Sequence, residues 1–356
     1  MEENIKKVKE MAAPLLAWYD EHKRDLPWRS DISAYRTWVS EIMLQQTRVS
    51  AVIPYFHRFL EAFPTVEALA AAEEDDLLKL WEGLGDYNRA RNLHRAAKMV
   101  AEEFGGKFPE TAADLRALPG VGDYTAGAIA SIAFGEKVPA VDGNVLRVLT
   151  RYLDHHGDIT EGKVKAELSV LAGEAVDEAR PGDFNQAMMD LGATVCLPNG
   201  TPICDLCPLK PKCRALKRGT CDNLPIRKEK KERRYEDRTV LIAVQNGKVA
   251  VRRRPKTGLL ASLWEFPSLD GTWAEWEMVI ALSKWNLTVT DWLSRRYARH
   301  IFTHVEWEMT GYFLRVSGEG VEDFRWVDKE EFKKLAIPSA FAAYRAEALR
   351  LLEEEA

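Results

Sequence analysis

The chain has 356 residues, of which 46% are hydrophobic and 29% are charged, and this composition excludes a disordered or low-complexity protein. The formal net charge of -5 argues against non-specific coating of nucleic acid, although a local basic surface would still bind phosphate. No apolar run approaches the ~18 residues of a membrane-spanning helix, and the N-terminal stretch MEENIKKVKE is charged. We therefore expect roughly two domains, no membrane segment, no signal peptide and a cytoplasmic location.

Residues 8 to about 195 have a helical pattern. Six prolines fall between the apolar segments and are expected to separate the helices: Pro14, Pro27, Pro54, Pro64, Pro109 and Pro119. Thr111 and Asp114 form a helix-capping pattern. The stretch TAGAIASIAF (125–134) has almost no polar side chain, which predicts a buried helix.

The pattern changes after a highly charged segment, RKEKKERRYEDR (227–238), which is typical of an exposed linker. The stretch TVLIAVQNGKVAVRRRP (239–255) predicts two strands joined by an Asn-Gly turn. HVEWEMTGYFLRV (304–316) alternates as a further strand, and TWAEWEMVIALSKW (272–285) predicts an amphipathic helix. The second half of the chain is therefore expected to be a separate α+β domain.

All five cysteines lie between Cys196 and Cys221, where disulfides are not expected in a cytoplasmic protein. Cys196, Cys204, Cys207 and Cys213 are separated by seven, two and five residues. Four thiolates in so short a loop can hold zinc or a [4Fe–4S] cluster, and the spacing alone does not distinguish the two. Buried structural thiols are the alternative interpretation, and Cys221 is expected to be a bystander.

Two carboxylates are candidate catalytic groups. Asp142, in PAVDGNVLRV, precedes an apolar helix. One interpretation is that Asp142 only caps this helix. The other is that the helix N-terminus keeps its carboxylate ionised, so that it can stabilise or attack a developing cation. Glu41 is expected on a helix face with Leu44, Gln45 and Arg48, away from the apolar stripe. A solvated face is the default interpretation of that spacing, which permits a catalytic role for Glu41 without showing one.

The stretch LPGVGDYTAG (118–127) places Gly120 and Gly122 directly before a helix. Glycines in such a turn let backbone N–H groups approach a phosphate, as in the helix-hairpin-helix motif that binds the DNA backbone. A plain tight turn between two helices is the alternative.

Taken together, these motifs resemble the endonuclease III superfamily of DNA glycosylases, and within it the MutY adenine glycosylases. The resemblance covers almost the whole chain. It is carried by DLPWR (25–29), SEIMLQQTRV (40–49), GLGDYNRARNLH (83–94), LPGVGDYTAGAIASIAFG (118–135), PAVDGNVLRV (139–148) and FNQAMMDLGATVC (184–196). The C-terminal half, with LLASLWEFP (259–267) and FTH (302–304), is similar to the MutT-like (Nudix) domain of that family.

The resemblance implies a fold and its boundaries. A mainly α helix-hairpin-helix glycosylase domain would span residues 1–221, with the motif at about 114–134 and the iron–sulfur loop at 196–213. Residues 222–237 would be the linker, and residues 238–356 an α+β Nudix-like domain that recognises 8-oxoguanine.

The resemblance also implies a mechanism. Glu41 would protonate adenine at N7, and Asp142 would stabilise or covalently trap the oxocarbenium-like sugar, as the two carboxylates do in glycoside hydrolysis. Tyr124 and Asn144 would position Asp142 or the catalytic water. The remaining residues implied to contact the substrate or DNA in this domain are Arg24, Trp28, Arg29, Leu44, Gln45, Gln46, Thr47, Tyr87, Gly120, Gly122 and Gln186.

Two further expectations follow from the resemblance. The related lyases have a lysine where this chain has Tyr124, and a tyrosine cannot form a Schiff base, so base removal without efficient strand cleavage is expected. In the C-terminal half no Arg-Glu-x-x-Glu-Glu metal box occurs between residues 247 and 290, which favours binding over nucleotide hydrolysis. Phe302, Thr303 and His304 match the family's Phe-Ser-His loop, which inspects the 8-oxoguanine.

The chain departs from the family pattern at three places. The first two cysteines are seven residues apart where six is usual, but a [4Fe–4S] cluster is still favoured over zinc. Asp86 replaces a tyrosine that wedges into the duplex, and Tyr87 is the candidate to take over. Thr303 replaces a serine and keeps the hydroxyl.

The predicted protein is a monomeric adenine glycosylase, associated with the nucleoid, that acts on duplex DNA containing A:8-oxoguanine or A:G mispairs. Sliding-clamp or repair partners are expected at the linker. Two rivals are a non-catalytic iron–sulfur lesion-recognition protein and a nucleotide hydrolase that uses the C-terminal domain.

Overall fold

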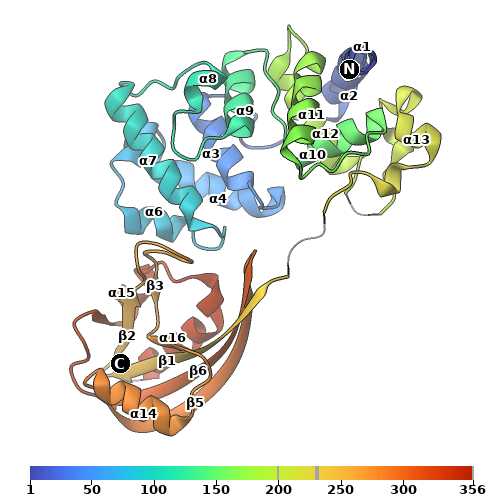
Figure 1. The fold of residues 1–356 in the computed structure, drawn as a ribbon. Coiled ribbons are helices and arrows are strands. Elements are labelled where there is room, and N and C mark those ends of the chain that lie inside the picture. Colours follow the sequence, from blue (N-terminus) through green and yellow to red (C-terminus); the bar gives the residue numbers. More distant parts are fainter. Residues whose placement is uncertain (199, 229–231, 355–356) are drawn as a thin grey trace. The chain divides into compact units, whose positions relative to one another are not determined.

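The computed structural model describes residues 1–198, 200–228 and 232–354, and these residues divide into two compact units. The first unit comprises residues 1–72 and 91–229, and it is built from helices (Figure 1). The second comprises residues 73–90 and 230–356, and it contains a mixed β-sheet. The predicted combination of a mainly α domain and an α+β domain is therefore confirmed.

The helices of the first unit alternate with short turns. They are α1 (Glu2–Lys9), α2 (Ala12–His22), α3 (Ala34–Leu44), α4 (Val49–Ala62), α5 (Val66–Ala70), α8 (Ala112–Leu115), α9 (Asp123–Phe134), α10 (Gly143–Leu153), α11 (Gly162–Ala175), α12 (Pro181–Thr194) and α13 (Arg214–Arg218). The long helix α7 (Tyr87–Glu103) begins in the second unit and continues into the first. None of the helices within the described residues is long and apolar enough to cross a membrane.

Local sequence signals explain several of these boundaries. Thr111 accepts a hydrogen bond from the backbone N–H of Asp114 and begins α8, as predicted. The expected buried helix is α9, whose residues 125–131 are all buried.

Pro27, Pro64, Pro109 and Pro119 lie between helices, as predicted. Pro14 and Pro54 lie inside α2 and α4 instead. Pro14 is the third residue of α2, where a backbone N–H has no partner within the helix, whereas Pro54 is the sixth residue of α4 and removes one intrahelical hydrogen bond.

The core of the first unit holds the cysteine loop against the helices that carry the site. Apolar side chains of α1, α2, α10, α11 and α12 form one cluster, which includes Leu149, Leu171 and Phe184. Cys196, Cys207 and Cys213 pack against this cluster. The loop is therefore fixed to the same helices as Asp142.

The second unit is a seven-stranded sheet with helices on both faces (Figure 1). Its strands are β1 (Arg234–Gln245), β2 (Lys248–Arg253), β3 (Trp264–Glu265), β4 (Ser268–Asp270), β5 (Thr288–Ile301), β6 (Val305–Ser317) and β7 (Phe324–Val327). The main strand order is β3-β2-β1-β6-β5, with β4 paired to β1 and β7 paired to β2. Strands β1 and β6 run parallel, in a register that places Arg234 opposite Val305, and the other pairs are antiparallel.

Each face of the sheet has its own core. Val240, Ile242 and Val244 belong to the core that contains residues of α15 (Lys329–Lys334) and α16 (Ala342–Glu354). Leu241 and Ala243 belong to the core that contains residues of α14 (Glu275–Lys284). Burial on both faces explains the continuous apolar run in β1.

The C-terminal elements read from the sequence are present. The β1–β2 hairpin turns at Asn246 and Gly247, both with positive φ as an Asn-Gly turn requires. Strand β6 and helix α14 match the predicted strand and amphipathic helix.

Two boundaries differ from those expected. Strand β1 begins at Arg234, inside the expected linker, because that segment pairs with β6 and its Glu236 accepts a hydrogen bond from the Trp307 indole. Residues 73–90, including α6 (Glu74–Leu80), group with the second unit rather than the first. Within that unit Asp75 pairs with Arg253.

Candidate active site

A cavity of about 630 Å³ in the first unit brings together most of the residues singled out from the sequence. Its lining combines the segment before α3, the end of α3, the start of α9, the start of α10 and one face of α12. The expected residues that line it are Arg24, Trp28, Arg29, Glu41, Leu44, Gln45, Gln46, Thr47, Gly122, Tyr124, Asp142, Asn144 and Gln186. Segments up to about 160 residues apart in sequence thus converge on one hollow.

Glu41 lies in α3 and is only 5% exposed. The interpretation of its helix face as solvated is therefore wrong. The apolar stripe of α3 is buried as predicted, but α3 packs on α9, and this contact covers the carboxylate face as well. The Tyr124 hydroxyl donates a hydrogen bond to Glu41 Oε2. Burial raises the pKa of Glu41 to about 7, and the negative charge of Asp142 acts in the same direction.

Asp142 is the N-cap of α10. Its Oδ1 accepts the backbone N–H of Val145 at 2.8 Å, and its Oδ2 accepts the Asn144 side-chain amide at 2.7 Å. Burial raises the pKa of Asp142, and these two hydrogen bonds counteract that rise by favouring the charged form. Asp142 is therefore a helix cap that also opens into the cavity, so the capping and catalytic interpretations are compatible.

Arg147 is a part of the site that the sequence did not single out. Its Nη2 donates to Asn144 Oδ1 at 2.8 Å and to the Gly192 carbonyl at 2.7 Å, and its Nε donates to the Cys196 carbonyl at 2.7 Å. Because Asn144 accepts from Arg147, its amide N–H points at Asp142. A signal was available in the i, i+3 spacing of Asn144 and Arg147, whose neighbours from Val145 to Leu149 are apolar.

Two of the expected pocket residues are held by a buried carboxylate. Asp190 in α12 is almost fully buried and pairs with Arg24 and with Arg29, whose Nη1 lies 2.7 Å from Asp190 Oδ2. Burial acts to raise the pKa of Asp190. The hydrogen bonds and positive charges of Arg29 and Arg24 outweigh this effect, so the pKa of Asp190 is lowered. Asp190 thus fixes both guanidinium groups along the cavity wall.

The glycine turn before α9 has the geometry its sequence requires. Gly120 has φ of +78°, and a Cβ there would lie 2.6 Å from Asn92 Cβ, so only glycine fits. Gly122 is the N-cap of α9 and has no side chain to cover the first backbone N–H groups of the helix. Gly122 lines the cavity, whereas Gly120 does not.

Tyr87, an expected DNA contact, does not line the cavity. Tyr87 is the first residue of α7 and is 5% exposed, whereas its neighbour Asp86 is exposed. Burial of the ring leaves no exposed aromatic edge for a wedge at Tyr87, so the suggestion that Tyr87 replaces the missing tyrosine is not supported.

All five cysteines have free thiols and line one small cavity with Arg151. Arg151 Nη1 lies 3.3 Å from Cys196 Sγ, and the Cys213 thiol lies 3.4 Å from the Arg151 carbonyl. Within residues 1–198, 200–228 and 232–354, no group of three or more His, Cys, Asp or Glu converges on a single metal ion. A donor set of thiols only, beside a cationic side chain, fits an iron–sulfur cluster.

The predicted recognition loop of the second unit is the turn between β5 and β6. The backbone N–H of Phe302 bonds to the Val305 carbonyl, and the Phe302 ring packs edge-on against Trp307, with centroids 4.9 Å apart. Thr303 and His304 are exposed. The turn thus has a half-buried aromatic anchor and a polar, accessible tip.

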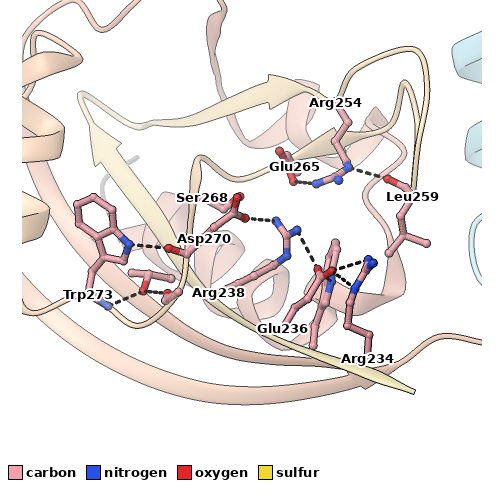
Figure 2. Close-up of polar contacts among 12 residues, drawn as sticks. Arg234, Glu236, Arg238, Arg254, Leu259, Glu265, Ser268, Asp270 and Trp273 are labelled. Carbon is pink, nitrogen blue, oxygen red and sulfur yellow. Dashed lines mark hydrogen bonds and ion pairs between the residues drawn. The ribbon is translucent and has the colours of Figure 1, made fainter. Parts of the chain in front are cut away.

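Acidic residues of the same sheet are paired with arginines (Figure 2). Glu265, 2% exposed, contacts Arg254 and also Arg252. Glu236 contacts Arg234, and Asp270 contacts Arg238 at 3.2 Å (Figure 2). Carboxylates neutralised in this way are poor magnesium ligands, which disfavours the nucleotide-hydrolase interpretation.

Comparisons with known proteins agree with both units. Residues 39–173 match the family of HhH-GPD superfamily base excision DNA repair proteins, and residues 239–347 match the NUDIX domain. A solved structure of a thermostable thymine-DNA glycosylase is 29% identical, with a TM-score of 0.54, over 60% of this chain and 98% of that one.

Two relatives cover most of the chain. An adenine DNA glycosylase of Rattus norvegicus is 38% identical over 92% of this chain and 75% of that protein. The adenine DNA glycosylase of Homo sapiens is also 38% identical, over 95% of this chain and 73% of that protein. Because these similarities extend through both units, the chain belongs to the adenine DNA glycosylase family.

Proposed function

We propose that this protein removes adenine from duplex DNA in which adenine faces 8-oxoguanine or guanine. The observation that carries the proposal is the meeting of Glu41, Tyr124 and Asp142 in one cavity. A cavity of about 630 Å³ has the size of a small-molecule site and admits a base rotated out of the helix.

The two carboxylates have different environments that suit different roles. Glu41 has a pKa of about 7, so a large fraction is protonated at neutral pH and can donate a proton to the adenine ring. Burial raises the pKa of Asp142, but two hydrogen-bond donors favour its anion, which can stabilise positive charge on the sugar. Separation of acid and anion within one site is the arrangement that glycosidic bond hydrolysis needs.

Tyr124 supports a glycosylase without efficient lyase activity. Its hydroxyl is bonded to Glu41, and burial is the main reason that its pKa is raised well above the usual value. A neutral phenol in that position forms no Schiff base with the sugar. Strand cleavage would therefore depend on later treatment of the abasic product.

Recognition of the opposite base is assigned to the turn at Phe302, Thr303 and His304. The exposed hydroxyl and imidazole at the turn's tip can hydrogen-bond a purine edge. The backbone N–H groups near Gly120 and Gly122 would hold the DNA backbone. The thiols of Cys196, Cys204, Cys207 and Cys213 would hold a [4Fe–4S] cluster, which supports the loop beside α10.

Single-turnover excision on matched duplexes tests this proposal. Duplexes with adenine opposite 8-oxoguanine, guanine or thymine are incubated with excess protein, and each sample is split into an arm with alkali and an arm without. We expect base release from the first two duplexes, faster from the first, and strand breaks only after alkali. Tight binding without release in every duplex would leave a lesion-recognition protein instead. Breaks without alkali would mean a lyase.

A further inference from the structure

The first residues of β1 reach the turn between β5 and β6 in the second unit. The backbone N–H of Arg234 donates to the His304 carbonyl at 3.1 Å, and Arg234 lies opposite Val305 in the register of β1 and β6. Arg234 belongs to the segment that the sequence predicted as the interdomain linker. The end of that segment is therefore bonded directly to the turn that carries Thr303 and His304.

Two main-chain hydrogen bonds hold this turn from its two ends. On the β5 side, the Phe302 N–H donates to the Val305 carbonyl at 2.8 Å. On the β6 side, the bond from Arg234 fixes the planar peptide group that joins His304 to Val305. The exposed side chains of Thr303 and His304 thus leave a backbone whose direction is set from both ends. Such fixed placement is what selective hydrogen bonding to a base edge requires.

A second contact from β1 supports the aromatic anchor of the turn. Trp307 is fully buried and packs edge-on against Phe302, and its indole Nε1 donates to Glu236 Oε2 at 2.9 Å. Glu236 also accepts hydrogen bonds from Arg234 at 2.9 Å and from Arg238 at 3.3 Å (Figure 2). Arg238 Cζ lies 4.1 Å from the centroid of the Trp307 ring. The indole beneath the anchor is therefore fixed by an acceptor and a cation that both belong to β1.

We propose that the start of β1, through Arg234 and Glu236, positions the β5–β6 turn for recognition of the base opposite adenine. The inference rests on the recognition role proposed above for that turn. Arg234 acts through its main-chain N–H on the carbonyl of His304. Glu236 acts through the Trp307 indole on the ring of Phe302. A strand that only began the sheet would affect stability but not the choice between opposite bases.

Arg234→Pro in the full-length protein tests the main-chain contact. The substitution deletes the N–H that holds His304, and proline is accepted as the first residue of a strand. Arg234→Ala is the matched control, because it keeps the N–H and removes only a side chain that is 75% exposed. Single-turnover excision rates are measured with adenine opposite 8-oxoguanine and with adenine opposite guanine.

We expect the ratio of the A:8-oxoguanine rate to the A:G rate to fall about fivefold or more in Arg234→Pro, because a displaced turn loses its hydrogen bonds to the base. In Arg234→Ala the ratio should stay within about twofold of wild type, since an exposed ion pair contributes little. The A:G rate depends on the cavity of the first unit, so it should stay near that of wild type and show that both variants are folded.

Two variants of Glu236 test the side-chain contact. Glu236→Ala removes the acceptor of the Trp307 indole N–H and should lower the same ratio about threefold or more. Glu236→Gln keeps an oxygen that can accept this bond, so it should restore most of the wild-type ratio. A ratio in Glu236→Ala equal to that of wild type would contradict the role of Glu236.

Combination with His304→Ala tests whether Arg234 acts through the turn. If it does, Arg234→Pro should lower the ratio much less in the His304→Ala background than in wild type, because the two changes affect one coupled unit. A double variant whose loss equals the product of the two single losses would overturn the proposal.

Two further results would overturn it: an unchanged ratio in Arg234→Pro, and an equal fall in Arg234→Pro and Arg234→Ala. These results refute the positioning role alone when wild type prefers the 8-oxoguanine duplex. Equal wild-type rates on the two duplexes would instead refute the recognition role of the turn, and the inference would fall with it. The two failures are therefore distinguishable.

Discussion

Glu41 is held in the cavity by burial and by the Tyr124 hydroxyl, and its protonation state should control the rate. The pKa of about 7 means that the acid form decreases as pH rises through neutrality. We expect the single-turnover excision rate to fall about tenfold per pH unit above about 7, which is the behaviour of a general acid. Glu41→Gln should be ~100-fold slower or worse and should lack this alkaline limb. A wild-type rate that stays level from pH 6 to 9 would contradict the role given to Glu41.

The same carboxylate should reduce the stability of the folded protein. Between its ordinary pKa of 4.5 and about 7, the folded state keeps a proton on Glu41 that the unfolded state has released. The free energy of unfolding contributed by this group therefore falls as pH rises through that window, by up to about 3 kcal/mol at ~1.4 kcal/mol per pKa unit.

Glu41→Gln removes this titration. Denaturant unfolding should show the variant to be more stable than wild type at pH 8 and closer to it near pH 4. A variant less stable than wild type at pH 8 would mean that the buried carboxylate contributes net stabilisation.

At the scale of elements, the contact between α10 and α12 sets the position of Asn144. A Cβ on Gly192 would lie 2.6 Å from Asn144 Cβ, and the Gly192 carbonyl also accepts a bond from Arg147. Gly192→Ala should therefore displace Asn144 from Asp142 and slow excision by about tenfold or more, while DNA affinity changes little. Gly162→Ala, at the start of α11 where a Cβ meets no atom within 4 Å, is the matched control. Equal rates for the two variants would show that Asn144 does not depend on this packing.

Local sequence signals predicted the secondary-structure elements and the candidate reactive side chains better than they predicted contacts between elements. The hairpin at Asn246, the buried helix α9 and the four-cysteine loop follow from local signals and were predicted. Burial of Glu41 was not, because it depends on α3 packing against α9 from far along the chain. Arg147 was missed for the same reason, since the Gly192 and Cys196 carbonyls that it contacts lie outside α10.

At the scale of the whole molecule, we propose that the first unit excises the base and the second recognises the opposite base. The exposed His304 side chain is at the tip of the β5–β6 turn, and its removal leaves the Phe302 anchor in place. His304→Ala should lower the ratio of excision rates on A:8-oxoguanine and A:G duplexes, with the A:G rate almost unchanged. Asn246→Gly, in the β1–β2 turn where φ is positive, is the control and should keep the wild-type ratio. An unchanged ratio in His304→Ala would place recognition elsewhere.

The most direct test of the central claim compares wild type with Asp142→Asn on a duplex with one adenine opposite 8-oxoguanine. Binding and single-turnover base release are measured in parallel. The amide keeps the size of the carboxylate and its contact with the Val145 N–H but removes the charge. The account predicts a dissociation constant within a few-fold of wild type and a rate of base release at least ~1,000-fold lower, because stabilisation of the developing positive charge is lost. Release by Asp142→Asn at a rate near that of wild type would contradict the account.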